Sequence, residues 1–343
     1  MSRAEVVANR GASMADVARL AGVSSQTVSR VSNRQSNVTE ATRQRVLQAM
    51  KTLDYRPNSA ARALKYGRFR SIGVIMFNLS TYGNTRTLDA IAIAAAEAGY
   101  SLTLFPVSEP TSQGLASAFE QLNESVVDGI VLVAEAKLFD RTELDLPARV
   151  PVVLADSTAG DKYAVVDSDQ RLGAVQATQH LLDLGHETVH LISGPKTSYS
   201  AMNREQAWRE TLTKAGVVVP EPCLGDWSTH SGYLCGQALA ARDDVTAIFA
   251  VNDQMALGAM RAFHERGIDI PNDVSIVGFD DIDEAESFWP PLTTVRQDFT
   301  GIGSTCIAIL IAEIEAQSNS QGTTLITTEL IVRGSTGPVR ALA

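Results

Sequence analysis

The order of short and long segments after Ser71 limits this chain to few folds. Apolar runs of three to six residues alternate with longer segments whose apolar residues recur at helical spacing. The sequence predicts strands at 72–77, 102–105, 130–133 and 152–154, and again at 189–192, 247–250 and 275–277. It predicts helices near 85–98, 112–124, 169–184, 201–215, 231–242 and 253–266. This alternation is typical of parallel sheets with crossover helices, so we expect an α/β body of two parallel-sheet lobes.

Length and composition fit a globular protein of more than one domain. The 343 residues are enough for two or three domains, and the 45% hydrophobic and 20% charged content excludes disordered and coiled-coil chains. The longest apolar runs, 91–96 and 307–311, fall short of the roughly 18 residues that a membrane span needs. Residues 1–11 lack the apolar core of a signal peptide, so we expect a cytoplasmic protein. The odd set of three cysteines, without a CxxC pair, fits a reducing compartment.

The net charge of -10 hides a division of the chain into a basic and an acidic part. Residues 1–70 contain 13 Lys and Arg against four Asp and Glu, whereas the remaining 273 residues carry 16 basic and 35 acidic side chains. A compact basic segment favours a polyanionic partner, and an acidic body repels one. The first 70 residues are therefore the candidate nucleic-acid-binding part.

Three short helices are expected in the basic segment. The first begins with a capping box of Ser13 and Asp16 and ends at Gly22. Its apolar face consists of Val17, Leu20 and Ala21. The second follows a cap at Ser24 or Ser25 and turns Val28 and Val31 inward. The third opens at Thr39 and Glu40, and its closing face consists of Val46, Leu47, Met50 and Leu53. Two helices joined by a tight turn and supported by a third form a helix-turn-helix unit.

The second helix carries hydrogen-bonding side chains on its outer face. Gln26 and Arg30 are four residues apart and therefore share one face near the helix start. In helix-turn-helix proteins this part of the helix contacts base edges in the major groove. Gln can pair bidentately with adenine and Arg with guanine, so this face is a candidate for sequence-specific DNA binding.

The head resembles a known family. The stretches Ala15-Asp-Val-Ala18, Ala21-Gly-Val-Ser24 and Thr27-Val-Ser-Arg-Val31 are similar to the headpiece of the LacI/GalR family of bacterial repressors. The resemblance implies binding to double-stranded, pseudo-palindromic operator DNA. It assigns DNA contacts to Ser25, Gln26, Thr27, Arg30, Asn33 and Asn37.

The segment Arg56-Pro57-Asn58-Ser-Ala-Ala61-Arg-Ala-Leu64 extends this resemblance to the family's hinge helix. In that family a leucine of the hinge wedges into the minor groove at a central base step and kinks the DNA. Leu64 matches this position, and Asn58 and Ala61 are the accompanying DNA contacts.

The body shares the resemblance, most clearly in Gly225-Asp-Trp227-Ser, Val251-Asn252-Asp-Gln-Met-Ala-Leu-Gly258 and Val277-Gly-Phe-Asp280-Asp. It implies a bilobal fold like that of periplasmic sugar-binding proteins, with crossings between the lobes near 167, 297 and 326. The expected domains are a head at 13–56, a hinge and linker at 57–70, and an effector-binding and dimerisation domain at 71–340. Lobe 1 then comprises about 71–167 and 298–325, and lobe 2 about 168–296 and 327–340.

A small-molecule site is expected where strands end between the lobes. Asp156, Asn252 and Asp280 each follow a predicted strand, and parallel strands bring such positions to one edge. Carboxylates, amides and a guanidinium can bind neighbouring sugar hydroxyls. By resemblance Arg204 is the effector arginine, and Trp227 and Phe299 cover the apolar face of the sugar ring. Leu79 and Gln297 complete the expected set of effector-binding residues.

Other classes of protein fit the sequence less well. Asp156 and Asp280 could serve a glycosidase, but neither lies in an apolar context that would raise the pKa of an acid, and a basic head has no role there. An exported sugar-binding protein would carry a signal peptide. His186 and His190 have a metal-like spacing, but Gly185-His186 is typical of the turn that ends a helix. We expect neither a metal nor a cofactor.

The sugar and the assembly state are less determined. Val133 replaces a polar cleft residue of the family member that the chain most resembles, so a galactoside is one of several glycosides that remain open. The segment after Val332 has no leucine heptads, and we therefore expect a homodimer. Whether the sugar induces or co-represses stays open.

Overall fold

The computed structural model describes residues 12–32, 37–55, 68–107, 112–124, 127–133, 150–156 and 161–339. The chain divides into two compact units, Met1–Phe69 and Arg70–Ala343. The first is the head and the second is the two-lobed body, and each is described by itself.

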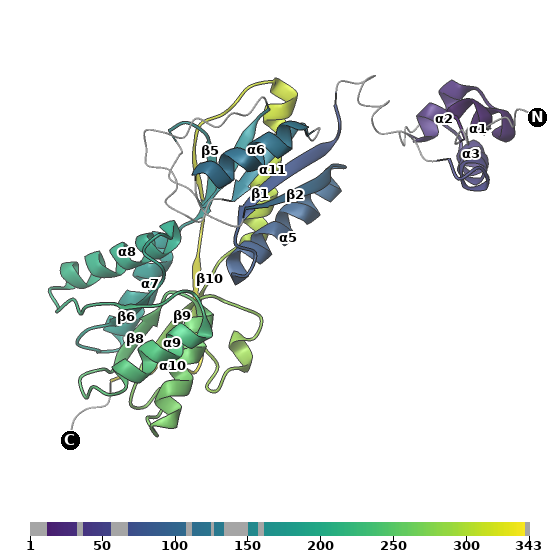
Figure 1. The fold of residues 1–343 in the computed structure, drawn as a ribbon. Coiled ribbons are helices and arrows are strands. Elements are labelled where there is room, and N and C mark those ends of the chain that lie inside the picture. Colours follow the sequence, from purple (N-terminus) through teal and green to yellow (C-terminus); the bar gives the residue numbers. More distant parts are fainter. Residues whose placement is uncertain are drawn as a thin grey trace, which may run out of the picture. The chain divides into compact units, whose positions relative to one another are not determined.

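The head is a three-helix unit around a small apolar core (Figure 1). Its helices are α1 (Met14–Ala21), α2 (Ser25–Ser32) and α3 (Glu40–Thr52). The capping box of α1 is present, because Ser13 Oγ accepts from the Asp16 amide while the Asp16 carboxylate accepts from the Ser13 amide. Gly22 ends α1 with a left-handed φ of 64°, which glycine adopts without strain. Helix α2 is capped by Ser24, whose Oγ accepts from the Thr27 amide at 3.1 Å.

Two apolar residues expected in the head core lie outside it. Leu20 and Leu47 are 53% and 45% exposed. The core stripe of α1 is made by Val17, Ala18 and Ala21, and that of α3 by Val46, Ala49 and Met50. A unit of three short helices buries only the narrow stripe that points at its centre, so apolar residues at the edges of each stripe stay in solvent.

Lobe 1 of the body is a parallel sheet of six strands in the order β11-β5-β4-β3-β1-β2. In that order the strands are β11 (Gly322–Ile326), β5 (Ala164–Ser168), β4 (Val152–Ala155), β3 (Gly129–Val133), β1 (Ser71–Phe77) and β2 (Ser101–Val107). In the middle of the sheet, Val74 lies opposite Leu104 on one side and Val131 on the other. Helices α5 (Tyr82–Glu97) and α11 (Phe299–Ala316) pack on one face, and α6 (Ser112–Glu124) packs on the other.

Lobe 2 has the same plan with one reversed strand. Its sheet order is β12-β10-β9-β8-β6-β7, and only β12 runs antiparallel to its neighbour. The strands are β12 (Glu329–Ile331), β10 (Thr293–Arg296), β9 (Ser275–Asp280), β8 (Ala247–Ala250), β6 (His190–Ser193) and β7 (Cys223–Leu224). Helix α7 (Gln170–Asp183) packs with α8 (Tyr199–Ala215), α9 (Thr229–Leu239) packs with α10 (Asp253–Glu265), and a 3-10 turn follows at Ala285–Ser287.

The chain passes between the two lobes three times. The first passage joins β5 to α7 at Asp169, the second joins β10 to α11 at 297–298, and the third joins β11 to β12 at 327–328. The sequence prediction placed these passages near 167, 297 and 326. Because each passage directly follows a strand, the strand ends of both sheets meet at this junction.

The expected fold class, a helix-turn-helix head with a bilobal α/β body, is confirmed. Five strands and one helix were not expected: β5, β7, β10, β11, β12 and α11. Of the described helices, α11 alone is long and apolar enough for a membrane span by length and composition, but it packs on lobe 1 through Cys306, Leu310 and Ile314. Its exposed positions 304 and 308 are Ser and Ala, so this part of the helix lacks the charged outer face that makes an amphipathic pattern clear.

The cysteines are not all free. Cys223 of β7 and Cys235 of α9 form a disulfide, with their Cα atoms 5.7 Å apart, and Cys306 is free and buried. The odd number of cysteines therefore contains one pair. Sequence spacing did not indicate it, because pairing depends on how β7 and α9 are brought together in the fold.

Candidate functional site

The outer face of α2 is the candidate nucleic-acid interface of the head. Ser25, Gln26 and Asn37 are exposed, and Arg30 is half-buried. Val28 and Val31 point into the head core, so Gln26 and Arg30 lie on the opposite side of α2. Thr27 is half-buried and its hydroxyl is 3.0 Å from Ser24 Oγ, which ties it to the helix cap. Asn33, Asn58, Ala61 and Leu64 lie outside the described residues.

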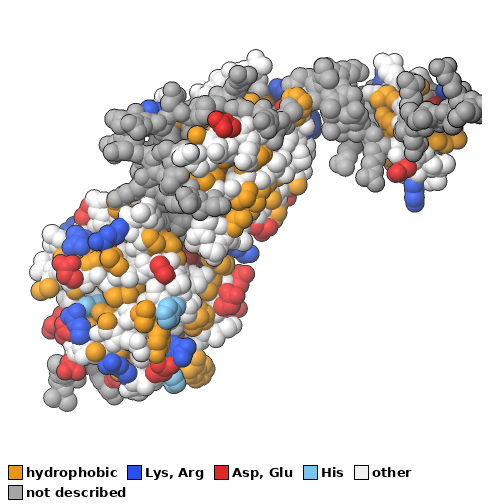
Figure 2. All heavy atoms as spheres, viewed as in Figure 1, with side chains coloured by type: hydrophobic (Ala, Val, Ile, Leu, Met, Phe, Trp, Pro, Cys, Tyr) orange, Lys and Arg blue, Asp and Glu red, His pale blue; other side chains and the backbone are white. Residues whose placement is uncertain are grey.

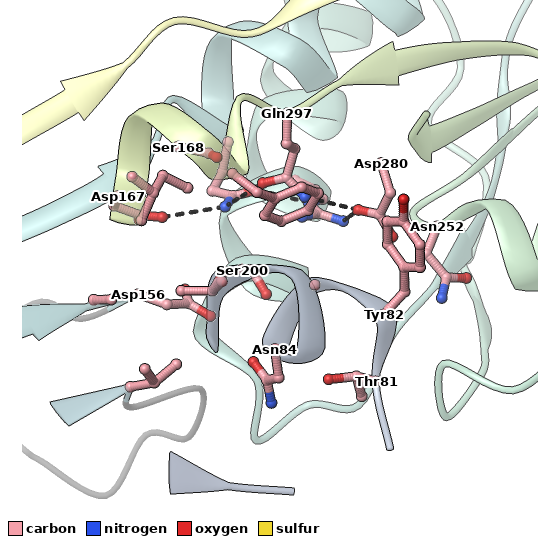
Figure 3. A pocket seen from close by; sticks show the side chains of 18 of the residues that line it. Thr81, Tyr82, Asn84, Asp156, Asp167, Ser168, Ser200, Asn252, Asp280 and Gln297 are labelled. Carbon is pink, nitrogen blue, oxygen red and sulfur yellow. Dashed lines mark hydrogen bonds and ion pairs between the residues drawn. The ribbon is translucent and has the colours of Figure 1, made fainter. Parts of the chain in front are cut away.

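A pocket lies where the strand ends of the two lobes meet. Lobe 1 contributes the starts of α5 and α11 and the ends of β3, β4 and β5, and lobe 2 contributes the start of α8 and the ends of β8 and β9. The polar lining residues are Thr81, Asn84, Thr87, Asp156, Asp167, Ser168, Gln170, Ser200, Arg204, Asn252, Asp280 and Gln297 (Figure 3). Seven of the eight expected effector-binding residues line this pocket: Asp156, Arg204, Trp227, Asn252, Asp280, Gln297 and Phe299.

Among the lining residues that the structure describes, Arg204 is the only cation, and it is 4% exposed. It projects from α8, whose cap Ser198 accepts from the Ala201 amide at 3.3 Å. Its guanidinium lies over the Phe279 ring, with 3.6 Å between the guanidinium carbon and the ring centroid. Arg204 donates to the Val251 carbonyl at 2.5 Å and lies 3.7 Å from an Asp280 carboxylate oxygen. These contacts fix the direction of its planar group, as bidentate binding of a ligand requires.

Three carboxylates surround this cation, namely Asp156, Asp167 and Asp280. Burial raises the pKa of Asp167 to about 7, while the Gln170 hydrogen bond and the Arg204 charge oppose that rise. Burial also lowers the pKa of Arg204, and the charges of Asp280 and Asp156 oppose that fall. The pocket thus combines one cationic group with several carboxylates in a site largely shielded from water.

Asn252 and Trp227 are positioned by each other. Asn252 is the cap of α10, where its Oδ1 accepts from the Met255 amide at 2.9 Å. Its Nδ2 donates to the Trp227 carbonyl at 3.0 Å, and so ties the loop after β7 to the end of β8. Trp227 packs on Gly194, where a Cβ atom would approach the indole ring to 2.8 Å. A side chain at residue 194 would therefore displace the indole from the pocket wall.

Aromatic rings from both lobes line the pocket. Tyr82 of α5 and Phe299 of α11 meet edge to face, with ring centroids 5.9 Å apart, and Trp227 comes from lobe 2. Apolar ring faces combined with carboxylate and amide groups suit a ligand with an apolar face and polar edges.

Backbone strain also marks the site. Asp156, Trp227 and Asp280 have φ values of 54°, 75° and 115°, which residues with side chains rarely adopt. Each of the three lies where the chain leaves a strand for a loop and lines the pocket. Such conformations persist where the surrounding structure enforces them, and they are frequent at binding sites.

Leu79 is the one expected effector residue that does not line the pocket, and it is 42% exposed. The chain turns after β1 because Asn78, with a φ of 50°, accepts from the Ser80 amide at 2.9 Å. This turn directs Leu79 to solvent and brings Thr81 and Tyr82 to the pocket instead.

Several polar lining residues were not expected from the sequence, among them Asn84, Asp167, Ser168, Gln170 and Ser200. A signal for two of them was present, because Asp167 and Ser168 follow the short apolar run Ala164-Val165-Val166. That run is β5, and an acidic residue at its end obeys the same rule that identified Asp156 and Asp280.

A helix-turn-helix head joined to a two-lobed ligand-binding body defines a class of ligand-responsive DNA-binding regulators. The model of the bacterial regulatory proteins of the lacI family matches residues 13–58, and that of the periplasmic binding protein-like domain matches residues 178–336. The HTH-type transcriptional repressor PurR of Mannheimia succiniciproducens is 33% identical over 94% of this chain and 98% of its own length. The lactose operon repressor of Escherichia coli K12 is also 33% identical, over 94% of this chain and 89% of its own.

Solved structures agree with these relatives. A lac repressor dimer bound to operator and the anti-inducer ONPF matches with a TM-score of 0.83 and 32% identity, covering 96% of this chain and all of the other. The complex of the regulator CelR with cellobiose matches with a TM-score of 0.70 and 30% identity, covering 94% and 99%. The chain therefore belongs to the LacI family and is a DNA-binding transcriptional repressor of that family. Its relatives are repressors and not enzymes.

Proposed function

We propose that this repressor controls carbohydrate-utilisation genes and that a small sugar, galactoside-like or another glycoside, is its effector in the interlobe pocket. The observation that carries the proposal is the set of three carboxylates, Asp156, Asp167 and Asp280, around the buried Arg204. Each sugar hydroxyl donates one hydrogen bond and accepts others, so it pairs with carboxylates and with a guanidinium together. The C–H face of the ring packs against Trp227 and Phe299.

A purine base is the second candidate effector, and the similarity to PurR repressors favours it. A purine is flat and carries no hydroxyl, so it offers no single group that donates to a carboxylate and accepts from Arg204 together. Asp167 and Asp280 already accept from Gln170 and Gln297, but a carboxylate can accept further hydrogen bonds. The combination of carboxylates with a buried guanidinium therefore favours the sugar.

The head supplies the DNA contacts in this proposal. Gln26 and Arg30 contact base edges in the major groove, supported by Ser25, Thr27, Asn33 and Asn37. In the hinge, Leu64 is the minor-groove wedge, and Asn58 and Ala61 are its DNA-contacting neighbours. The partner is pseudo-palindromic double-stranded operator DNA, which places the protein in the cytoplasm at the nucleoid.

A homodimer brings two heads to the two halves of such an operator. Apolar side chains exposed on three helices of the body support this assembly: Ile93 on α5, Leu234 on α9 and Leu257 on α10. Figure 2 shows hydrophobic side chains gathered over α5. Exposed apolar surface of this kind is typical of interfaces between subunits.

Calorimetric titration of the full-length protein tests the effector. The panel contains methyl β-galactoside, lactose and cellobiose on one side, and hypoxanthine and guanine on the other. The proposal predicts saturable binding of at least one sugar and none of the purines. Binding of a purine without binding of any sugar would overturn it.

A further inference from the structure

Gln170 is a buried glutamine at the junction between the two lobes. It is the first residue of α7, directly after the passage from lobe 1 to lobe 2, and its side chain lines the pocket. It is 5% exposed, so its amide must find partners inside the protein.

Its amide makes three hydrogen bonds. The Oε1 atom accepts from Arg204 Nε at 2.8 Å. The Nε2 atom donates to Asp167 Oδ1 at 3.2 Å and to Gln297 Oε1 at 3.4 Å. Gln297 in turn donates from its Nε2 to Asp280 Oδ1 at 2.7 Å, and the dashed lines in Figure 3 follow this chain. One side chain therefore connects both lobes and the central cation.

The donor and acceptor atoms of these side chains fix the direction of each hydrogen bond in the series. Arg204 has only donors, so Gln170 must turn its oxygen towards the guanidinium and its nitrogen towards Asp167 and Gln297. That choice makes the Gln297 oxygen an acceptor and leaves its nitrogen for Asp280. Neither the Gln170 amide nor the Gln297 amide can be flipped without breaking several hydrogen bonds at once, so the series has one arrangement.

Asp169 and Gln170 together contact all three passages between the lobes. Gln170 lies at the first passage, and its Nε2 reaches Gln297 at the second. The neighbouring Asp169 meets the third, because its amide donates to the Ile326 carbonyl at 2.8 Å and its carbonyl accepts from Thr328 Oγ1 at 3.1 Å. Any rotation of one lobe against the other bends these three segments, so it changes the distances around Gln170.

We infer that Gln170 is a positioning residue that couples the interlobe pocket to the three crossing segments, so that occupancy of the pocket alters the angle between the lobes. The inference rests on the proposed function for the identity of the effector. This role does not require contact between Gln170 and the effector. Gln170 holds Arg204 and Gln297 in an arrangement that exists in only one lobe orientation, and a ligand that favours another orientation must rearrange it.

Amide hydrogen exchange of the full-length, ligand-free protein tests the coupling. Gln170→Met keeps the length of the side chain and removes its hydrogen bonds, and Gln179→Met alters an exposed glutamine of the same helix. We expect Gln170→Met to raise the exchange rate at 297–298 and at 326–328 by about fivefold or more, and Gln179→Met to leave both unchanged. Faster exchange confined to the start of α7 would overturn the inference.

Gln170→Glu, alone and together with Asp167→Asn, distinguishes the loss of one hydrogen bond from the loss of packing at residue 170. Gln170→Glu keeps the acceptor for Arg204 but loses the donor for Asp167, so exchange at the crossings should rise. Adding Asp167→Asn supplies the missing donor from the other side and should return part of the protection at 326–328. If the double variant exchanges as fast as Gln170→Glu alone, the hydrogen bond between residues 167 and 170 has no such role.

The response to effector gives the final readout. Operator Kd is measured with and without saturating methyl β-galactoside, and then with each other sugar of the panel. In Gln170→Met the ratio of the two Kd values should fall to within about twofold of one, while Gln179→Met keeps the ratio of the unmodified protein. If no sugar changes the operator Kd of the unmodified protein, the carbohydrate proposal fails, whereas the exchange measurement still decides the role of Gln170.

Discussion

At the scale of single residues, Arg204 is the side chain on which ligand binding depends most. It is buried among carboxylates and lies against the Phe279 ring. Water therefore cannot take the place of its guanidinium in hydrogen bonds to a ligand. Charge-assisted hydrogen bonds contribute roughly 1.5–3 kcal/mol each. Losing two of them in Arg204→Ala should weaken sugar binding by orders of magnitude in calorimetric titration. Because Arg204 belongs to the body, binding of the head to operator in the same variant should change little, and sugar binding of ordinary strength would contradict its assignment.

Asp167 makes a second residue-scale prediction, on pH. Burial raises the pKa of its carboxyl from 3.8 to about 7, so the folded protein holds this proton more tightly than the unfolded chain does. Asp167 therefore contributes stability at low pH that is lost as pH rises towards about 7. Asp167→Asn does not titrate and can still accept from Gln170, so its stability relative to the unmodified protein should increase from pH 4 to pH 7.

Urea unfolding of both proteins across this pH range measures the difference. Burial lowers the pKa of His180, His186 and His190, so these histidines reduce the stability of the folded protein as pH falls. Both proteins contain them, and their contribution therefore cancels in the difference. A difference in unfolding free energy that does not vary with pH would mean that Asp167 ionises normally in the fold.

At the scale of elements, the close packing of α9 on α10 fixes the wall of the pocket that carries Trp227 and Asn252. A Cβ atom at Gly258 of α10 would lie 2.0 Å from the Thr229 carbonyl oxygen and 2.5 Å from the Tyr233 amide nitrogen. Backbone atoms cannot move aside as a flexible side chain can. Gly258→Ala should therefore destabilise the body by about 1–3 kcal/mol, although alanine favours helices more than glycine does.

Thermal unfolding of Gly258→Ala beside His264→Ala provides the comparison. His264 is exposed on the same helix, so its truncation should change stability by no more than about 0.5 kcal/mol. If Gly258→Ala melts at or above the temperature of His264→Ala, the two helices have more freedom to separate than their contacts indicate.

How well an element could be predicted from the sequence depended on its length and on the regularity of its apolar residues. Segments with a clear apolar period, such as 112–124 and 247–250, match the structural bounds of α6 and β8. Strands that are short or exposed give no such pattern, and β7 has only two residues. Rules for strand ends located Asp156, Asn252 and Asp280, but Gln170 followed from no local pattern, because its role comes from partners 34 and 127 residues away.

At the scale of the whole molecule, we expect a dimer. Analytical ultracentrifugation should give about twice the subunit mass of 36.7 kDa. Arginine in place of Ile93, an exposed residue of α5, should weaken the dimer if this helix contributes to the interface. A monomer at micromolar concentration, or a stable tetramer, would require a different assembly.

Control of DNA binding by the pocket is the central claim, and operator affinity measured against effector concentration tests it most directly. Fluorescence anisotropy of a labelled operator with the full-length repressor gives Kd at each concentration of every sugar and purine in the panel. Coupling between two sites is typically 5- to 150-fold, and at least one sugar should change the operator Kd within that range. An operator Kd that stays constant with every sugar, or that responds to a purine and to no sugar, would contradict control of DNA binding by a sugar in the pocket.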